Sequence, residues 1–136
     1  ECPQLRFLRI EGSLYFGAVD HVGDYLQRIG EQRPELKHLL VLSKGMNFVD
    51  VAGAELLARE AAGRRTRGGG LYFHGLRESA SRMLTGPAFA ARFGPDAVFA
   101  TKGEAIAALF GRLDRGICAG CRARIFTECR SLPPAT

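Results

Sequence analysis

The sequence predicts an α/β fold with a mainly parallel sheet of four to five strands, an antiparallel edge strand and about four helices. Segments with strand and helix character alternate along the chain, which is typical of parallel sheets with right-handed crossovers. The uninterrupted apolar run at 39–42 indicates a strand that is buried on both faces, as parallel strands are. The 136 residues suffice for one domain that buries roughly two-thirds of its unfolded surface.

The first third of the chain predicts a β-hairpin followed by a helix. Residues 5–10 form one apolar run and residues 14–16 a second, and a glycine between two such runs is a hairpin signal. We therefore expect the second strand to return antiparallel beside the first, at an edge of the sheet. A helix of about three turns follows and ends between Gly30 and Pro34. Its apolar stripe consists of Val19, Val22, Leu26 and Ile29.

The segment at 47–57, which follows the buried strand within 36–43, predicts the start of a second helix. Asp50 stands where the apolar period changes, so its carboxylate can accept hydrogen bonds from the free N–H groups of the first turn. Gly53 lacks a side chain where that turn approaches another segment. The stripe on the buried face consists of Ala54, Leu57, Ala58 and Ala61. The i,i+4 pairs expected on the solvent side are Glu55 with Arg59 and Glu60 with Arg64.

The second half of the chain predicts two further strands, at 71–74 and 97–100, each followed by a helix. The three glycines before 71–74 end the preceding helix, because a phosphate-binding loop would instead leave a strand and open a helix. A capping box at 101–104 begins the last helix. The core stripe of that helix consists of Ile106, Leu109, Phe110 and Leu113. We expect one domain at 1–115 and a basic tail with cysteines at 116–136.

The charge of the chain, +5 with 16 arginines among 19 basic residues, does not predict nucleic-acid binding. The basic residues are spread out apart from 64–67 and the tail, and no recognition motif accompanies them. We expect Arg64, Arg65 and Arg67 to be solvated at the end of a helix, near the negative end of its dipole. The arginines of the tail also fit a place near an anionic surface. No apolar run approaches the ~18 residues that span a bilayer, and the start at Glu1 indicates a piece of a longer protein.

Asp50 and His74 are the candidate catalytic pair, because both follow predicted strands at the edge where open α/β sheets bind ligands. In an enzyme His74 would act as a base and Asp50 as its orienting carboxylate, with Ser43 or Lys44 nearby. The sequence has no G-x-S-x-G nucleophile motif and no H-E-x-x-H metal pair. We therefore expect a protein that is not an enzyme and has no cofactor, with Asp50 as a helix cap and His74 in a strand-end turn.

The four cysteines of the chain leave three interpretations open. Cys118 and Cys121 form a C-x-x-C pair, which occurs in redox motifs and, with two further ligands such as Cys2, in zinc sites. A continuous helical tail would place Cys121 and Cys129 roughly 12 Å apart, too far to share one metal ion. We therefore expect reduced thiols that pack as small hydrophobes. Cys118, Cys121 and Cys129 are the alternative metal or redox residues.

Two motifs resemble STAS domains, which occur in sulfate transporters and in anti-sigma factor antagonists. The motif N-F-V-D-V-A-G at 47–53 is similar to the signature of that family. The motif R-I-E-G-S-L-Y-F-G-A at 9–18 is similar to the opening of the C-terminal STAS domain of SulP-type anion permeases, and the similarity extends over about 5–113. The resemblance implies the STAS (anti-sigma factor antagonist-like) fold. It also implies a regulatory domain without chemistry of its own, close to but not inserted in the bacterial inner membrane, on its cytoplasmic face.

The resemblance further implies an interaction surface at the junction, formed by Asp50, Val51, Gly53 and Ala54, and a nucleotide contact at Asp50 and His74. In the antagonist branch a kinase phosphorylates the serine directly after the junction aspartate, but Val51 has no hydroxyl, so that switch is not carried over. The implied partners are the transmembrane domain of the same polypeptide, a cytosolic regulatory protein and a second copy of the chain. The alternatives are a free-standing STAS signalling protein without its phosphorylation site and a small thiol or metal protein that uses the C-x-x-C tail.

Overall fold

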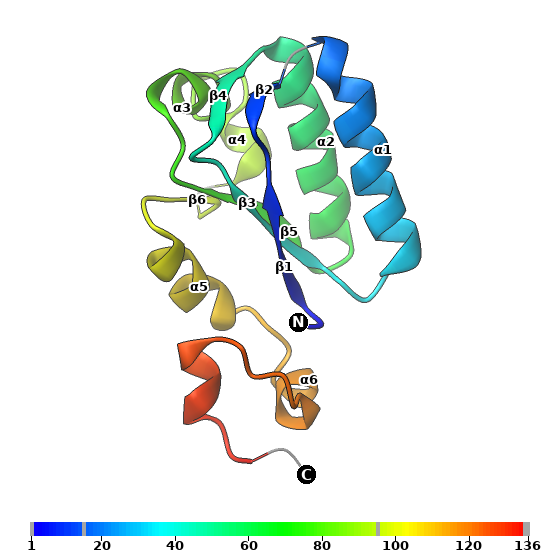
Figure 1. Cartoon of the computed structure of the whole chain (residues 1–136), viewed down its shortest axis with the longest axis vertical. Helices are drawn as coiled ribbons and strands as arrows, with labels where there is room; N and C mark the ends of the chain where they lie inside the picture. Colours follow the sequence, from blue (N-terminus) through cyan, green and yellow to red (C-terminus); the bar gives the residue numbers. More distant parts are fainter. Residues whose placement is uncertain (1, 15, 95, 135–136) are drawn as a thin grey trace.

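The structure is a computed structural model that describes residues 2–14, 16–94 and 96–134. Its strands are β1 (Leu5–Arg9), β2 (Gly12–Leu14), β3 (His38–Leu42), β4 (Met46–Val49), β5 (Gly70–His74) and β6 (Val98–Phe99). Its helices are α1 (Phe16–Gln32), α2 (Val51–Thr66), α3 (Glu78–Leu84), α4 (Ala90–Phe93), α5 (Lys102–Phe110), α6 (Arg115–Gly120) and the 3-10 helix η1 (Thr127–Ser131). Figure 1 shows α1 and α2 side by side against one face of the sheet, with α5 against the other.

The main sheet has the strand order β1-β3-β5-β6, and all its neighbouring strands run parallel. β2 and β4 form a separate parallel pair. The predicted antiparallel edge is therefore wrong, since every strand pair within the described residues is parallel. Gly12 explains the difference. Its φ of 79° turns the chain, and its N–H donates to the Gly45 carbonyl (2.8 Å), so β2 is led to β4 rather than back along β1.

Neither β4 nor α4 is predicted from the sequence. In β4, Met46 and Val49 are buried while Asn47 and Phe48 between them are exposed, so the strand lacks the alternation that would mark it. α4 has four residues, which are too few to display a helical period. Both elements are short and are fixed by contacts with segments distant in sequence.

The core lies between α2 and the central strands, as predicted. Residues 39–41 of β3 are fully buried. The fully buried stripe of α2 consists of Ala54, Leu57, Ala58 and Ala61. The glycine turn after α2 is confirmed, because Gly68 has a φ of 84° and the Gly69 N–H donates to the Arg64 carbonyl (2.8 Å).

Arg64 contradicts the prediction of a solvated helix end. Its side chain is 1% exposed, donates from Nη1 to the Leu36 carbonyl (2.7 Å) and from Nε to Glu60 (2.8 Å). The last turn of α2 packs onto the segment that enters β3, so this arginine ties the two together. Arg65 and Arg67 are exposed, as predicted.

The helices α1 and α5 follow the sequence prediction with shifted bounds. α1 is longer than three turns, at 17 residues, and its buried side includes Leu26 and Ile29. α5 begins with the predicted cap, because Thr101 Oγ1 accepts a hydrogen bond from the Glu104 N–H (3.1 Å). Leu109 and Phe110 are buried, and α5 packs against β5 and β6.

The C-terminal tail folds back beside the start of the chain, at the lower end of Figure 1. The Gln4 side-chain amide donates to the Asp114 carbonyl (3.1 Å) and accepts from the Asp114 N–H (2.8 Å). Phe126 packs against Phe7, with 5.8 Å between the ring centroids. The tail is not one continuous helix, because α6 ends before Cys121 and, in the described part of the tail, only the short η1 follows. The boundary between domain and tail stays a prediction.

Candidate functional site

The junction between β4 and α2 is built around Asp50. Its backbone is extended, and its carboxylate accepts a hydrogen bond from the Gly53 N–H (2.8 Å), which confirms the predicted helix cap. The Asp50 N–H donates to the Leu14 carbonyl (3.0 Å) at the end of β2. One residue therefore fixes both the start of α2 and the position of the small β2-β4 sheet.

Gly53 and Ala54 lie inside the molecule, which corrects their predicted place on the interaction surface. A Cβ on Gly53 would lie 2.6 Å from the Leu14 carbonyl oxygen, so β2 packs directly onto the first turn of α2. Ala54 is fully buried beside it. The prediction that Gly53 permits a close approach is confirmed, but the approaching segment belongs to this chain. These two residues support the surface from beneath.

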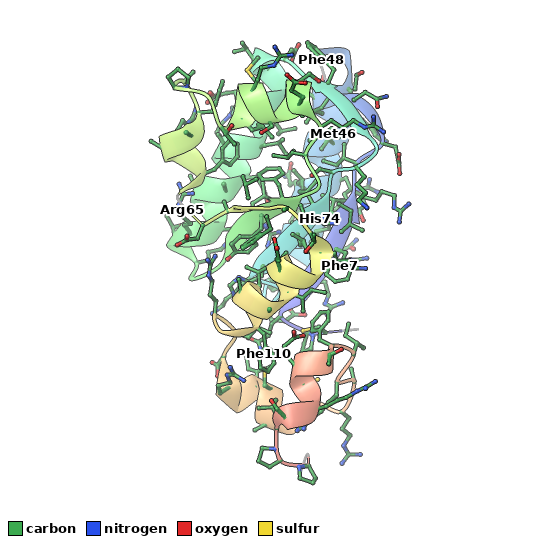
Figure 2. All side chains as sticks on the ribbon, turned by 90° about the vertical axis from the view of Figure 1, so that its left-hand side faces the viewer. Phe7, Met46, Phe48, Arg65, His74 and Phe110 are labelled. Carbon is green, nitrogen blue, oxygen red and sulfur yellow. The ribbon has the colours of Figure 1, made fainter. Side chains whose placement is uncertain are left out.

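Val51 and Phe48 are the large apolar side chains that the junction exposes, at 63% and 47%. We call these two residues the junction patch. Phe48 is missing from the sequence prediction because its position in β4 gave no sign that it faces solvent. The Ser79 hydroxyl at the start of α3 donates to the Asn47 carbonyl (2.7 Å), which holds β4 under the patch. Figure 2 shows Phe48 at the top of the molecule, well away from His74.

A cavity of about 290 Å³ lies at the carboxyl ends of β1, β3 and β5. We call it the edge pocket. Its cationic residues are Arg9, Lys44 and Lys102, and Glu11 pairs with Arg9 at 3.6 Å. The remaining lining residues are Leu42, Gly45, His74, Ala100 and Thr101. The pocket occupies the edge at which open α/β sheets bind ligands.

His74 is buried in the wall of the edge pocket, and neither of its ring nitrogens has a hydrogen-bond partner within the described residues. Burial, followed by the charges of Lys44 and Lys102, lowers the pKa of His74, which favours the neutral ring. Asp50 does not line the pocket and does not orient this ring. Ser43 is fully buried and donates to the Val41 carbonyl (3.1 Å). The predicted catalytic constellation is therefore not assembled.

The three cysteines named as metal or redox candidates are free thiols. Cys118 and Cys129 are buried, and Cys121 is half-buried. In the part of the chain that the structure describes, no three His, Cys, Asp or Glu side chains are placed so that they could hold a metal ion as they stand.

Comparison with known families assigns the fold. The family model of the STAS domain matches residues 2–105, which include the junction and the edge pocket. The chain belongs to the STAS domain family. The STAS fold expected from the two motifs is thus confirmed, with the difference that its strands pair in parallel throughout the described residues.

Solved STAS structures of both kinds are similar to this domain. The anti-sigma factor antagonist SpoIIAA in its unphosphorylated form aligns over 82% of this chain and 93% of its own, with a TM-score of 0.66 and 15% identity. The STAS domain of a SulP transporter from Vibrio cholerae aligns over 79% and 82%, with a TM-score of 0.62 and 20% identity. The murine anion transporter Slc26a9 aligns over 79% of this chain and 18% of its own, with a TM-score of 0.65 and 17% identity. These likenesses carry the fold alone.

Two further findings concern related sequences and the helices of this STAS domain. No curated protein sequence matches the chain. Among the described residues, none of the helices combines the length and the apolar character that crossing a membrane requires.

Proposed function

We propose that this STAS domain is a non-catalytic regulatory module of a SulP-type anion transporter and that it docks through the junction patch. The observation that carries the proposal is the exposure of Phe48 and Val51 beside the capped start of α2. Exposed apolar side chains on a rigid support favour a protein contact, because burying them against a partner removes apolar surface from water. The support is rigid because Asp50 and Leu14 hold the junction by hydrogen bonds.

Val51 separates this domain from a phosphorylation switch. A phosphoserine at that position would face the positive end of α2, which would stabilise its negative charge. The phosphate would also give the docking surface a negative charge. A valine supplies a permanent apolar contact in its place. The docking proposed here is therefore constitutive.

The proposed partner is the transmembrane domain of the same polypeptide, on the cytoplasmic face of the bacterial inner membrane. A cytosolic regulatory protein and a second copy of this chain are the other occupants that the patch would accept. The alternative function is a free-standing STAS signalling protein that lacks a phosphorylation site, which would use the same patch toward a cytosolic partner. The two functions differ in where the partner resides.

The test is a pull-down with the immobilised chain, run separately on solubilised membranes and on cytosol from the source cell. Val51→Arg places a charge on the patch, and Ile117→Arg, at a side chain that is 44% exposed in α6, is the matched control. We expect wild type and Ile117→Arg to retain a SulP-type membrane protein that Val51→Arg loses. A cytosolic protein with the same pattern would favour the free-standing function. Equal capture by all three chains would refute docking at the junction.

The edge pocket favours a second candidate function, the binding of a nucleotide phosphate. Three cationic side chains around a cavity of about 290 Å³ suit an anionic ligand, although Asp50, named with His74 as a nucleotide contact, lies outside the lining. Calorimetry with millimolar guanine and adenine nucleotides tests it. We expect heat from wild type and from Lys37→Gln, an exposed lysine outside the pocket, and none from Lys44→Gln combined with Lys102→Gln. No heat from wild type would refute this candidate.

A further inference from the structure

All four cysteines of the chain line one small cavity between the N-terminus and the tail. The free volume of this cavity is about 10 Å³, close to the space that one water molecule needs. The other lining residues are Pro3, Gln4, Leu113, Arg124, Ile125 and Leu132. Sequence spacing alone joins only Cys118, Cys121 and Cys129. The fold adds Cys2 from the opposite end of the chain.

The four thiols come from three segments that the fold holds together. Cys2 precedes β1, Cys118 lies in α6, Cys121 is the C-cap of α6, and Cys129 lies in η1. The Cys121 N–H donates to the Cys118 carbonyl (3.1 Å), so this C-x-x-C pair is folded into a tight turn. Two cysteines at this spacing recur as a ligand pair in structural zinc sites.

Arg124 fixes the loop that follows this turn. Its φ of 41° is unusual for a residue other than glycine, and its guanidinium donates to the Cys121 carbonyl (3.0 Å) and the Leu132 carbonyl (3.2 Å). The loop therefore returns Cys129 to the cavity instead of continuing α6 away from it. This return removes the objection that a helical tail would separate Cys121 from Cys129.

We propose that Cys2, Cys118, Cys121 and Cys129 bind one Zn²⁺ as a tetrahedral four-thiolate site. Each thiol gives up its proton to solvent when its sulfur bonds to the metal, so the bound unit carries a net charge of about −2. Four sulfur ligands also suit an iron–sulfur cluster, but a cavity with room for a single small sphere favours one ion. Nothing is oxidised or reduced in this step.

The surroundings of the cavity suit a thiolate centre. The Gln4 amide already donates to Cys118 Sγ (3.3 Å), the kind of N–H···S contact that stabilises a metal-bound thiolate. The charges of Arg115, near Cys118, and Arg124, in the cavity wall, oppose the negative charge of the bound unit. Because the sulfurs do not yet surround a common point, binding requires thiols to turn about χ1 toward the cavity. Cys2 and Cys121 are only half-buried.

A redox pair fits these surroundings less well. Cys118 is buried, whereas a reactive cysteine needs access to solvent. A metal ion also explains how the tail keeps its shape, because residues 121–134 contain only η1 as regular structure. Metal binding supplies folding free energy to segments of this kind.

The test measures metal in the 136-residue chain, purified without chelator. We expect one zinc per chain, and after exchange for Co²⁺ we expect the intense visible bands of tetrahedral cobalt with a sulfur-to-metal charge-transfer band. Cys2→Ser is the decisive variant, because a site made by the tail alone would not need this residue. We expect it to weaken zinc binding about tenfold or more. Ala119→Ser, an exposed hydroxyl added between the two cysteines of the pair, is the control and should bind zinc as wild type does.

Three outcomes would overturn the proposal. The first is a chain that takes up neither zinc nor cobalt while circular dichroism shows it folded and all four thiols react after unfolding. The second is a disulfide between two of the four cysteines in the metal-free chain purified under nitrogen. The third is zinc affinity that Cys2→Ser leaves unchanged, because the site would then lack the ligand that the fold supplies. Wild-type metal content decides the matter even if a variant fails to fold.

Discussion

Replacing Gly53 by alanine tests whether β2 sits as tightly against α2 as the structure places it. Alanine is normally the better helix residue, by at most about 1 kcal/mol. At Gly53 the new Cβ would lie 2.6 Å from the Leu14 carbonyl oxygen and 2.8 Å from Leu14 Cγ. The oxygen belongs to the backbone, so it can move away only if the β2-β4 sheet shifts as well.

The expected magnitude follows from these two opposed effects. Forcing a methyl group into a packed site costs about 1–3 kcal/mol. A shift of β2 would also weaken the hydrogen bond from the Asp50 N–H to the Leu14 carbonyl (3.0 Å), which contributes about 1 kcal/mol. Against a gain of at most about 1 kcal/mol from helix propensity, we expect Gly53→Ala to lose about 1–3 kcal/mol of unfolding free energy.

Gly63 provides the matched control within the same helix. It is exposed, and a Cβ there meets nothing within 4 Å. Gly63→Ala should therefore gain about 0.5–1 kcal/mol, the reverse of the change at Gly53. Urea unfolding of the three chains, with equal m-values as the check on two-state behaviour, measures the difference. If Gly53→Ala proved as stable as wild type while Gly63→Ala gained stability, the close packing of β2 on α2 would be refuted.

Two further predictions concern buried charge and acid. Arg64→Ala should lower the free energy of unfolding by about 2–4 kcal/mol, because the buried Leu36 carbonyl loses its hydrogen-bond donor. The control Arg65→Ala, at an exposed side chain, should change it by less than about 0.5 kcal/mol. Thermal unfolding of the two variants and the wild type makes the comparison. Burial, then neighbouring arginines, lowers the pKa of His38 to about 4, and burial lowers the pKa of His74. In the unfolded chain a histidine takes up its proton near pH 6.5, whereas folded His38 stays neutral down to about pH 4. The free energy of unfolding is therefore highest above pH 6.5. It decreases as the pH falls toward 4, and His38 contributes at most about 1.4 kcal/mol of that decrease per pH unit. Urea unfolding at pH 7.5 and 5 checks this, and a pH response unchanged by His38→Gln would contradict it.

The parts of the fold that the sequence predicts are those that local physics decides. The apolar run of β3 has no polar face, so it has no alternative to burial between two layers. Asp50 and Thr101 cap helices because each side-chain oxygen accepts a hydrogen bond from the free N–H group three residues later. This local contact does not depend on what the helix packs against. These features require no knowledge of what lies across the sheet.

The strand pairing required information that the local sequence does not contain. Gly12 was compatible with a tight hairpin, but β2 pairs with β4, more than thirty residues away. Arg64 shows the same limit for burial. Its i,i+4 spacing from Glu60 is typical of an exposed ion pair on a helix. The structure instead places the guanidinium in the interior, where it donates hydrogen bonds to Glu60 and to the Leu36 carbonyl.

The candidate sites show which inferences depend on the path of the backbone. Val51 is exposed at the junction, and its role in an interaction surface stays a prediction. The partners of Gly53 and Ala54 could not be inferred before β2 was placed beneath them. A continuous helix through the tail would separate Cys121 from Cys129. α6 instead stops after Gly120, and Arg124 turns the chain, which brings Cys129 back toward the pair.

The proposals for the junction patch and for the cysteine cavity concern opposite ends of the parallel sheet, so their experiments are independent. β1 begins beside the cysteine cavity, while the chain after β1 enters β2, which ends at Leu14 under the junction patch (Figure 1). Loss of zinc would loosen the start of β1 but leave the hydrogen bond between Leu14 and Asp50 intact. Val51→Arg should therefore keep full zinc content, and Cys2→Ser should keep its capture of the membrane partner. Joint loss of both properties in either variant would show global unfolding rather than a site effect.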